Sequence, residues 1–282
     1  MAEQGSVADP GATVVQAGTR RQACAALAGR CWRVVATGVA FAAFGVGALA
    51  LGVLVYPLLL LCERRRARRS AVARWIIHHL FRGFVALICA LGLCSVEVRG
   101  RERLRRDGLL IVASHPSLID VALLMSLVRG ADCIVKAALL RNPFTRGPVR
   151  AAGFVCNDSG PTLIDDCLAS VRAGNNLIVF PEGTRTPPGL ALGRLQRGAA
   201  HLALRGGLAI TPVRITCSQQ MLGKSDKWWR VPRRAGHFVI DVGADIPIDN
   251  HLAEDGAQAL AARRLNDELA RHLGAERPHA AA

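Results

Sequence analysis

One histidine and one aspartate stand five positions apart in SHPSLID, Ser114–Asp120, a segment between two apolar runs that predict a strand and then a helix. Pro116 is typical of the first turn of a helix, which would place His115 at the helix start and Asp120 one turn inside. The carboxylate could then accept a hydrogen bond from one imidazole nitrogen and leave the other as a general base. No Gly-x-Ser-x-Gly nucleophile motif occurs, so such a base would act on a substrate hydroxyl. The alternative is that His115 and Pro116 only start a helix.

The segment VFPEGTRT, Val179–Thr186, is a second candidate site at the end of another predicted strand. Gly183 allows the backbone to approach a ligand, and Thr184 and Arg185 offer donors of the kind that hold a phosphate. Glu182 suits a simple anion site poorly, so we expect it to fix the loop or Arg185. A charged surface turn is the alternative for this stretch.

Strands and helices alternate from residue 109 to residue 242. The predicted strands are short and continuously apolar, which is typical of a sheet buried on both faces. The expected strands are Leu109–Ala113, Cys133–Lys136, Gly153–Cys156, Leu177–Phe180, Ile210–Ile215 and His237–Val242, and the expected helices are Pro116–Val128, Leu163–Ala173 and Leu195–Arg205. The sequence therefore predicts an α/β fold with a mixed sheet covered by helices.

An apolar region precedes these elements. Residues 34–62 contain no charged residue and are long enough to cross a bilayer, since about 20 helical residues suffice. Pro57 is expected to kink this span or mark its end. The arginine-rich segment Glu63–Arg69 favours the cytoplasmic side and anionic headgroups. A second apolar run, Phe84–Val96, is short for a crossing and is expected to form a re-entrant or interfacial helix, so the two runs predict a membrane-anchoring helical hairpin.

The composition agrees with a membrane protein. The chain is 51% hydrophobic with a mean hydropathy of +0.27, and its net charge is +15. The basic residues flank apolar segments without a nucleic-acid-binding motif, which favours anionic lipid over nucleic acid. Nine scattered cysteines without a CxxC pair indicate reduced thiols and no metal site. The segment Lys224–Arg234 has two tryptophans among five basic residues, so we expect it at the membrane interface or on an acidic carrier protein.

The two motifs together, His-x4-Asp and FPEGTR, resemble those of the glycerolipid acyltransferase family, which includes lysophosphatidic acid acyltransferases. The resemblance covers about residues 70–245, and FPEGTR is highly specific to the family. It implies that His115, oriented by Asp120, deprotonates the hydroxyl of the acceptor. It also implies that Pro212, in the strand ITPVRI, lies near the acyl donor. The residues with an implied role in binding the acceptor's phosphate are Glu182, Gly183, Thr184 and Arg185.

One family feature is altered between the two motifs. The family usually has an arginine there that helps to bind phosphate, whereas this chain has Asn157 and Asp158 near that place. An acid would repel a phosphate, so another cation would have to replace the arginine. Lys136 is the candidate substrate-binding residue, with Arg141 and Arg146 as alternatives. A solvated basic face is an equally good interpretation of these three.

We therefore expect a membrane-bound O-acyltransferase that moves an acyl chain from acyl-CoA or acyl carrier protein to a lysophospholipid, first of all 1-acyl-sn-glycerol-3-phosphate, to give phosphatidate. Membrane lipids and the thioester donor are the expected partners, with no metal, no tightly bound cofactor and no nucleic acid. The motifs also resemble a bacterial branch found with aryl polyene lipid pathways, so a specialised lipid acceptor is an alternative. A non-catalytic lipid-binding scaffold is another.

The sequence predicts four consecutive segments of the chain and a membrane location. Residues 1–30 are predicted to be a flexible or loosely helical tail, and residues 31–96 a transmembrane and interfacial anchor. Residues 97–250 are predicted to form the acyltransferase domain, and residues 251–282 a C-terminal helix and tail. The expected location is the inner membrane, with the catalytic domain facing the cytoplasm.

Overall fold

The computed structural model describes residues 10–158, 160–187, 189–219, 231–232, 234–249 and 258–274. Its α-helices are α1 (Pro10–Ala50), α2 (Tyr56–Cys62), α3 (Arg66–Ala90), α4 (Asp120–Leu127), α5 (Ala138–Arg141), α6 (Pro143–Ala152), α7 (Leu163–Arg172), α8 (Gly198–Gly206) and α9 (Gln258–Gly274). Its strands are β1 (Cys94–Arg99), β2 (Leu110–Ala113), β3 (Ala131–Val135), β4 (Val155–Cys156), β5 (Asn176–Val179), β6 (Ile210–Cys217) and β7 (Gly236–Val242). A π-helical turn, Leu51–Val55, joins α1 to α2.

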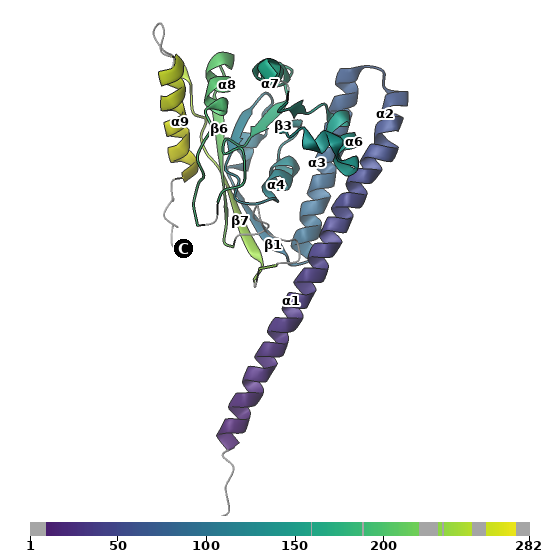
Figure 1. Cartoon of the computed structure of the whole chain (residues 1–282), viewed down its shortest axis with the longest axis vertical. Coiled ribbons are helices and arrows are strands. Elements are labelled where there is room, and N and C mark those ends of the chain that lie inside the picture. Colours follow the sequence, from purple (N-terminus) through teal and green to yellow (C-terminus); the bar gives the residue numbers. More distant parts are fainter. Residues whose placement is uncertain are drawn as a thin grey trace, which may run out of the picture.

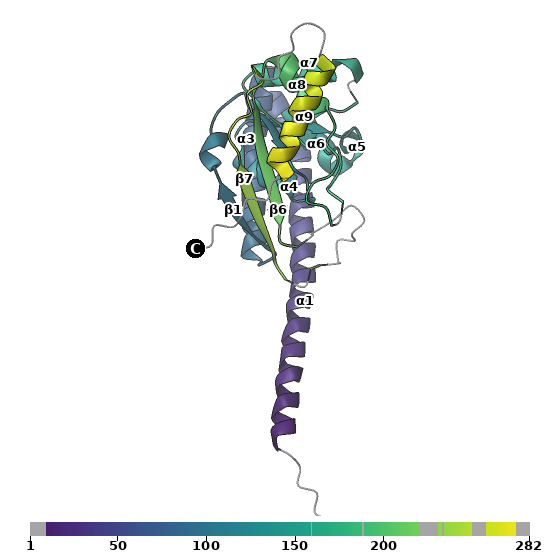
Figure 2. The ribbon, with the colours of Figure 1, turned by 90° about the vertical axis from the view of Figure 1, so that its left-hand side faces the viewer.

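The strands form one sheet in the order β1-β7-β6-β2-β5-β3-β4. Its neighbouring strands are parallel except for the antiparallel pair β6–β7. Helices α3 and α4 lie on one side, and α7, α8 and α9 lie on the other (Figures 1 and 2). The predicted mixed sheet covered by helices is therefore confirmed.

Strand β2 lies at the centre of the sheet and is buried on both faces. Ile111 and Ala113 pack with α3 and α4, whereas Leu110 and Val112 pack with the core under α7, α8 and α9. Successive side chains of a strand point to opposite faces, so a strand covered on both sides must be continuously apolar. This is why β2 contains no polar residue, and why the loop that carries the histidine starts from a rigid base.

The N-terminal helices form a hairpin, with α1 and α2 running antiparallel to α3 (Figure 1), but its second arm is longer and starts earlier than the predicted run Phe84–Val96. Two helical stretches of the described chain are long and apolar enough to cross a membrane, Leu27–Cys62 and Arg66–Ala90. Helix α1 begins at Pro10, within the part expected to be a flexible or loosely helical tail. Of the two expected roles of Pro57, ending the helix was wrong, because the helix continues through α2. Proline has no backbone N–H to donate within a helix, and the π-helical turn that precedes it accommodates this loss.

The prediction for Phe84–Val96 was wrong. Helix α3 already starts at Arg66, and Cys94 begins the first strand of the sheet, three residues before the predicted start of the domain. Gly92, with φ +70°, ends the helix because it adopts the left-handed conformation with little strain. The next residues then pair with β7, a tertiary contact that the apolar run alone does not reveal.

A buried ion pair fastens α3 to the sheet. Nη2 of Arg74 lies 3.1 Å from Oδ2 of Asp132 on β3, and the side chains are 8% and 0% exposed. The Ser170 hydroxyl donates to the same carboxylate oxygen. Burial raises the pKa of Asp132, while Arg74 and Ser170 act in the opposite direction. Removal of one partner of such a pair costs about 3–5 kcal/mol, so α3 is part of the domain as well as of the hairpin.

The hairpin also contacts α6 through two glycines, Gly52 and Gly147. A Cβ added to Gly147 would overlap the Cα of Gly52, so the two helices approach as closely as they do because neither residue has a side chain. We expect Gly147→Ala to destabilise the protein by about 1–3 kcal/mol through overpacking. The thermal unfolding temperature in detergent measures this.

The matched control for this prediction is Gly45→Ala on α1, where an added Cβ meets no atom within 4 Å. There the gain in helix propensity should leave the unfolding temperature unchanged or slightly raised. Equal unfolding temperatures for the two variants would contradict the close packing of α6 on the hairpin.

Candidate functional site

His115 and Asp120 contact each other in the loop between β2 and α4. Nδ1 of His115 lies 3.0 Å from Oδ2 of Asp120, and the side chains are 16% and 0% exposed. Asp120 is the first residue of α4, so the expected helix start at Pro116 was wrong. The loop places the imidazole beside the carboxylate without the constraint of helical geometry, under which a five-residue offset would separate them.

Ser117 fixes the carboxylate of Asp120 in this loop. Its N–H and its hydroxyl each donate to Asp120 at 2.6 Å, to Oδ2 and Oδ1 respectively. Burial raises the pKa of Asp120, and the hydrogen bonds from His115 and Ser117 act against that rise. The sequence analysis did not identify Ser117, although a serine three residues before an acid is a known local pairing. With Nδ1 bonded to Asp120, Nε2 of His115 is the nitrogen that faces away from the carboxylate.

Glu182 joins the two motifs. Its Oε1 accepts the backbone N–H of His115 at 2.8 Å, and its Oε2 accepts the Thr186 hydroxyl and the Gly193 N–H, each at 2.8 Å. In return, the N–H of Thr186 donates to the carbonyl of His115 at 2.7 Å. A Cβ on Gly193 would overlap Oε2, so a larger residue there would displace the carboxylate of Glu182 from this position. Of the expected roles, fixing the loop suits this buried carboxylate better than contact with a phosphate.

The ring of Phe180 stacks on the imidazole of His115. Their centroids are 4.3 Å apart and their planes are inclined by 29°. Phe180 follows β5, which pairs with β2, so adjacent strands bring the two rings together. The sequence analysis missed this contact, because a phenylalanine at a strand end is usually a core residue. The stack and the Asp120 hydrogen bond together restrict the rotation of the imidazole.

Three other predicted site residues lie in the FPEGTR turn, near His115 and Asp120, and differ in exposure. Gly183, with φ +65°, is exposed, and Thr184 and Arg185 are half-buried in the same turn as Glu182. Gly183 adopts a conformation that favours glycine, as expected for a turn that exposes its backbone. The turn is held against the His115 loop by the Glu182 hydrogen bonds described above, so these residues share one edge of the sheet with the histidine.

Lys136 and Pro212 lie on either side of this centre. Lys136 is exposed directly after β3, which neighbours β5, so it lies at the edge where β5 carries the FPEGTR turn. The side chain of Asn157 accepts the N–H of Ala137 at 3.1 Å and thereby braces the backbone next to Lys136. Pro212 is buried within β6, opposite Val112 of β2. Their roles in substrate binding stay predictions, as do those of Gly183–Arg185.

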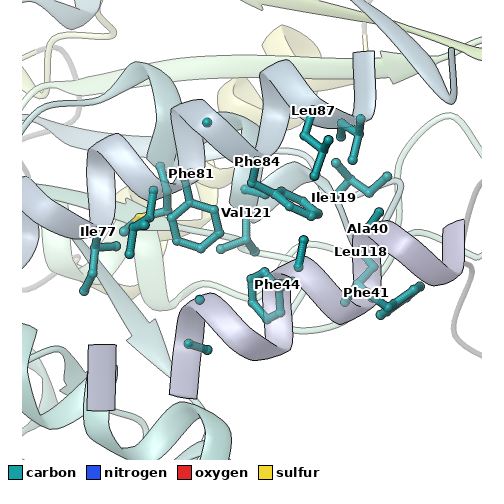
Figure 3. A pocket seen from close by; sticks show the side chains of 18 of the residues that line it. Ala40, Phe41, Phe44, Ile77, Phe81, Phe84, Leu87, Leu118, Ile119 and Val121 are labelled. Atoms are coloured by element: carbon teal, nitrogen blue, oxygen red, sulfur yellow. The ribbon is translucent and has the colours of Figure 1, made fainter. Parts of the chain in front are cut away.

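A cavity of about 700 Å³ lies between α1, α3 and α4, and most of its lining is apolar. Figure 3 shows Phe81 and Phe84 of α3 opposite Phe44 of α1, whose ring centroid is 6.1 and 5.6 Å from theirs. Leu118 and Ile119, which stand between His115 and Asp120 in the sequence, belong to the lining. The candidate catalytic loop is thus also a wall of the cavity.

Most of the tryptophan-containing segment Lys224–Arg234 lies outside the described residues.

We expect Glu182→Gln to lower kcat about 10- to 100-fold with little change in fold. The amide nitrogen cannot accept a hydrogen bond, and a bond to a charged group contributes about 1.5–3 kcal/mol. Circular dichroism and acyl-transfer assays measure the two effects. The control is Glu97→Gln on β1, a partly exposed residue outside this network. Wild-type kcat in both variants would show that Glu182 does not position His115.

Comparison with known proteins agrees with these features. Residues 95–216 match the family model described as Acyltransferase. The chain is 28% identical to 1-acyl-sn-glycerol-3-phosphate acyltransferase of Pseudomonas aeruginosa over 149 residues, which cover 50% of this chain and 56% of the relative. It is 34% identical to the lyso-ornithine lipid O-acyltransferase of the same organism over 141 residues, which cover 49% and 53%. The chain spans about half the length of the curated relatives it matches.

The fold is also similar to that of a solved structure. The crystal structure of PlsC, the 1-acyl-sn-glycerophosphate acyltransferase of Thermotoga maritima, superposes with a TM-score of 0.60 at 20% identity, over 84% of this chain and 96% of that one. Residues 95–216, which carry the His-x4-Asp and FPEGTR loops joined by Glu182, are thus similar in sequence to the acyltransferase family and to the 1-acyl-sn-glycerol-3-phosphate acyltransferases, and the fold of the chain is similar to that of PlsC.

Proposed function

We propose that this protein is a membrane-bound O-acyltransferase that esterifies the hydroxyl of a lysophospholipid, with 1-acyl-sn-glycerol-3-phosphate as the first acceptor. The observation that carries the proposal is the hydrogen bond between His115 and Asp120, next to an apolar cavity and fixed by Glu182 of the FPEGTR turn. A histidine oriented by a buried carboxylate is the arrangement that a general base requires. Relatives named for this reaction add support.

The proposed reaction begins with the proton of the acceptor hydroxyl. Asp120 holds Nδ1 of His115, so Nε2 takes this proton as the hydroxyl oxygen attacks the thioester carbonyl of acyl-CoA or acyl carrier protein. The tetrahedral intermediate collapses as the carbon–sulfur bond breaks, and the imidazolium returns the proton to the leaving thiolate. The products are an ester, here phosphatidate, and a free thiol. These steps use no metal and no tightly bound cofactor.

The acyl chain of a substrate would bind in the cavity between α1, α3 and α4. The lining is mainly leucine, isoleucine, valine, alanine and phenylalanine, so a hydrocarbon chain gains free energy there by leaving water. Leu118 and Ile119 connect the cavity to the His115 loop, which would bring the reacting end of a bound chain toward the base. A scaffold without catalysis would not need an imidazole held at this place.

The phosphate of the acceptor would bind at the exposed turn after β5. Gly183 presents its backbone, and Thr184 and Arg185 supply a hydroxyl and a guanidinium. Lys136, after the adjacent strand, is the proposed replacement for the arginine that the family usually has between its two motifs, with Asn157 bracing the turn beside it. Pro212 remains the proposed neighbour of the acyl donor.

A second candidate acceptor is lyso-ornithine lipid. Asp158 stands near the place where the family has a phosphate-binding arginine, and an acid there suits a phosphate-free acceptor better than lysophosphatidate. A relative 34% identical to this chain is named for that acceptor. A specialised lipid of an aryl polyene pathway is a further alternative within the same chemistry.

We propose that the protein is associated with a membrane through its apolar N-terminal helices, because two helical stretches of the described chain are long and apolar enough to cross one. We propose that it lies in the inner membrane with the catalytic domain on the cytoplasmic side. The arginine-rich segment Arg64–Arg69, which includes the end of the turn after α2 and the first residues of α3, supports this orientation, because basic residues that flank a span favour the cytoplasmic face.

We expect His115→Ala to abolish acyl transfer, since the variant lacks the proposed general base that takes the hydroxyl proton. The assay uses purified protein in detergent, labelled acyl-CoA or acyl carrier protein, and lysophosphatidate and lyso-ornithine lipid in parallel. The matched control, His201→Ala on α8, removes an exposed imidazole outside the site and should keep wild-type activity.

The pattern of products decides between the acceptors. Histidine-dependent formation of phosphatidate would support the first candidate, and transfer only to lyso-ornithine lipid would replace it by the second. No transfer to either acceptor by folded wild-type protein would overturn both, and full activity of His115→Ala would overturn the general-base mechanism.

A further inference from the structure

One end of the apolar cavity carries two arginines, Arg33 of α1 and Arg234 in the segment before β7. We call Arg33, Arg234, Leu118 and Ile119 the basic end of the cavity. Apart from the arginines, the polar side chains of the lining are few and uncharged or weakly basic: Thr37, His79 and Thr145. Two guanidinium groups in such a lining are a departure from what an acyl chain alone requires.

The position of Arg33 along the cavity follows from the packing of α1 against α3. Trp32 donates its indole N–H to the carbonyl of Leu91 at 3.1 Å, so this level of α1 lies beside the C-terminal end of α3. Arg33 is two helical turns from Ala40 and therefore on the same face of α1. Figure 3 shows Ala40, Leu118 and Ile119 at one end of the cavity and Ile77 at the other. Arg33 thus lies at the end formed by the His115 loop.

The guanidinium of Arg33 is held in place but has no described acidic partner. Its Nε donates to the carbonyl of Pro232 at 3.1 Å, and the side chain is half-buried. Among the described residues, no carboxylate forms an ion pair with it. A Cβ at Gly29 would lie 3.5 Å from Nη1, so the guanidinium lies beside the preceding turn of α1. A cation that is partly desolvated and positioned without an anion is costly unless a ligand supplies one.

We propose that Arg33, with Arg234, binds a phosphate group of a substrate at the basic end of the cavity. This inference rests on the proposed function and names a further binding site for it. Arginine suits a phosphate because its planar fork can donate two parallel hydrogen bonds. The hydrocarbon chain of the same or the other substrate occupies the apolar part beyond.

The charge of the two substrates is the reason that a second cation site is needed. Lysophosphatidate carries a phosphate, and so do acyl-CoA and the phosphopantetheine arm of acyl carrier protein. The turn Gly183–Arg185 can hold one of these phosphates, and the substrate that carries the second must be held so that its reacting group reaches His115. Arg33 and Arg234 supply positive charge for this second phosphate. They lie at the end of the cavity that Leu118 and Ile119, two residues of the His115 loop, help to form.

The test compares Arg33→Gln, Arg234→Gln and Arg33→Lys with Arg30→Gln. Arg30 is an exposed residue of α1, three positions before Arg33 and outside the cavity lining, so its variant makes the same charge change on the same helix. KM and kcat are measured separately for lysophosphatidate, lyso-ornithine lipid and each acyl donor. Loss of a charged hydrogen bond to phosphate should raise the relevant KM about 10- to 100-fold with kcat nearly unchanged.

The substrate whose KM changes identifies the source of the phosphate. A raised KM for lysophosphatidate alone assigns the site to the acceptor, and a raised KM for the donors assigns it to the thioester arm; both support the proposal. In either case Arg33→Lys should recover part of the loss. The proposal is overturned if Arg33→Gln and Arg30→Gln have the same KM for every substrate.

A binding measurement keeps this inference separate from the proposed reaction. His115→Ala protein, with and without Arg33→Gln, is titrated with lysophosphatidate and with CoA, and unfolding temperatures check that each variant is folded. Weaker binding of either phosphate compound in the double variant would support the site even if the wild-type protein transferred no acyl group. Equal binding of both compounds by folded proteins would overturn it.

Discussion

The buried carboxylate of Glu182 holds the two loops of the site together, and the placement of the histidine depends on it. Its oxygens accept three hydrogen bonds, from the backbone of His115, from Thr186 and from Gly193. A buried carboxylate needs that many donors, because an unpaired one would be strongly destabilising. These three hydrogen bonds fix the loop after β2 relative to the loop after β5 more tightly than strand pairing alone would. Glu182 of the FPEGTR motif thus connects, by hydrogen bonds, two loops that lie at the same edge of the sheet.

The hairpin that carries the proposed membrane anchor also lines the cavity beside the candidate site. Arg74 connects α3 to β3 through the buried carboxylate of Asp132, and Gly52 allows α6 to pack closely on the segment that follows α1. These contacts hold α1 and α3 at the separation that leaves the cavity between them. A domain that only needed tethering could use a linker, whereas here the same helices are anchored at several points along their length.

The sequence predicted the features that depend on local pattern. The apolar runs before His115 and before Pro181 located two central strands, and each motif was expected directly after its strand; that both loops lie at one edge of the sheet follows from the parallel pairing of β2 and β5. It did not predict that Cys94 starts an edge strand, since the pairing with β7 joins residues far apart in the sequence. It missed α5 and α6 as well as the contacts of Ser117 and Phe180, because loop conformation and ring stacking follow from tertiary packing. The assigned roles of Lys136 and Pro212 rest on resemblance.

The cavity is lined by both the hairpin and the α/β domain, and this affects how the protein can be truncated and solubilised for experiments. Phe44 of α1 packs against two phenylalanines of α3, so a version shortened before residue 63 to make it water-soluble would lose one side of the cavity. It would also expose the apolar face of α3 to water. In the intact protein, the alkyl tail of a solubilising detergent resembles the hydrocarbon of a lipid and can compete for the same space. The choice of amphiphile therefore becomes a variable in any kinetic experiment, and nanodiscs or short-tailed detergents are the better media.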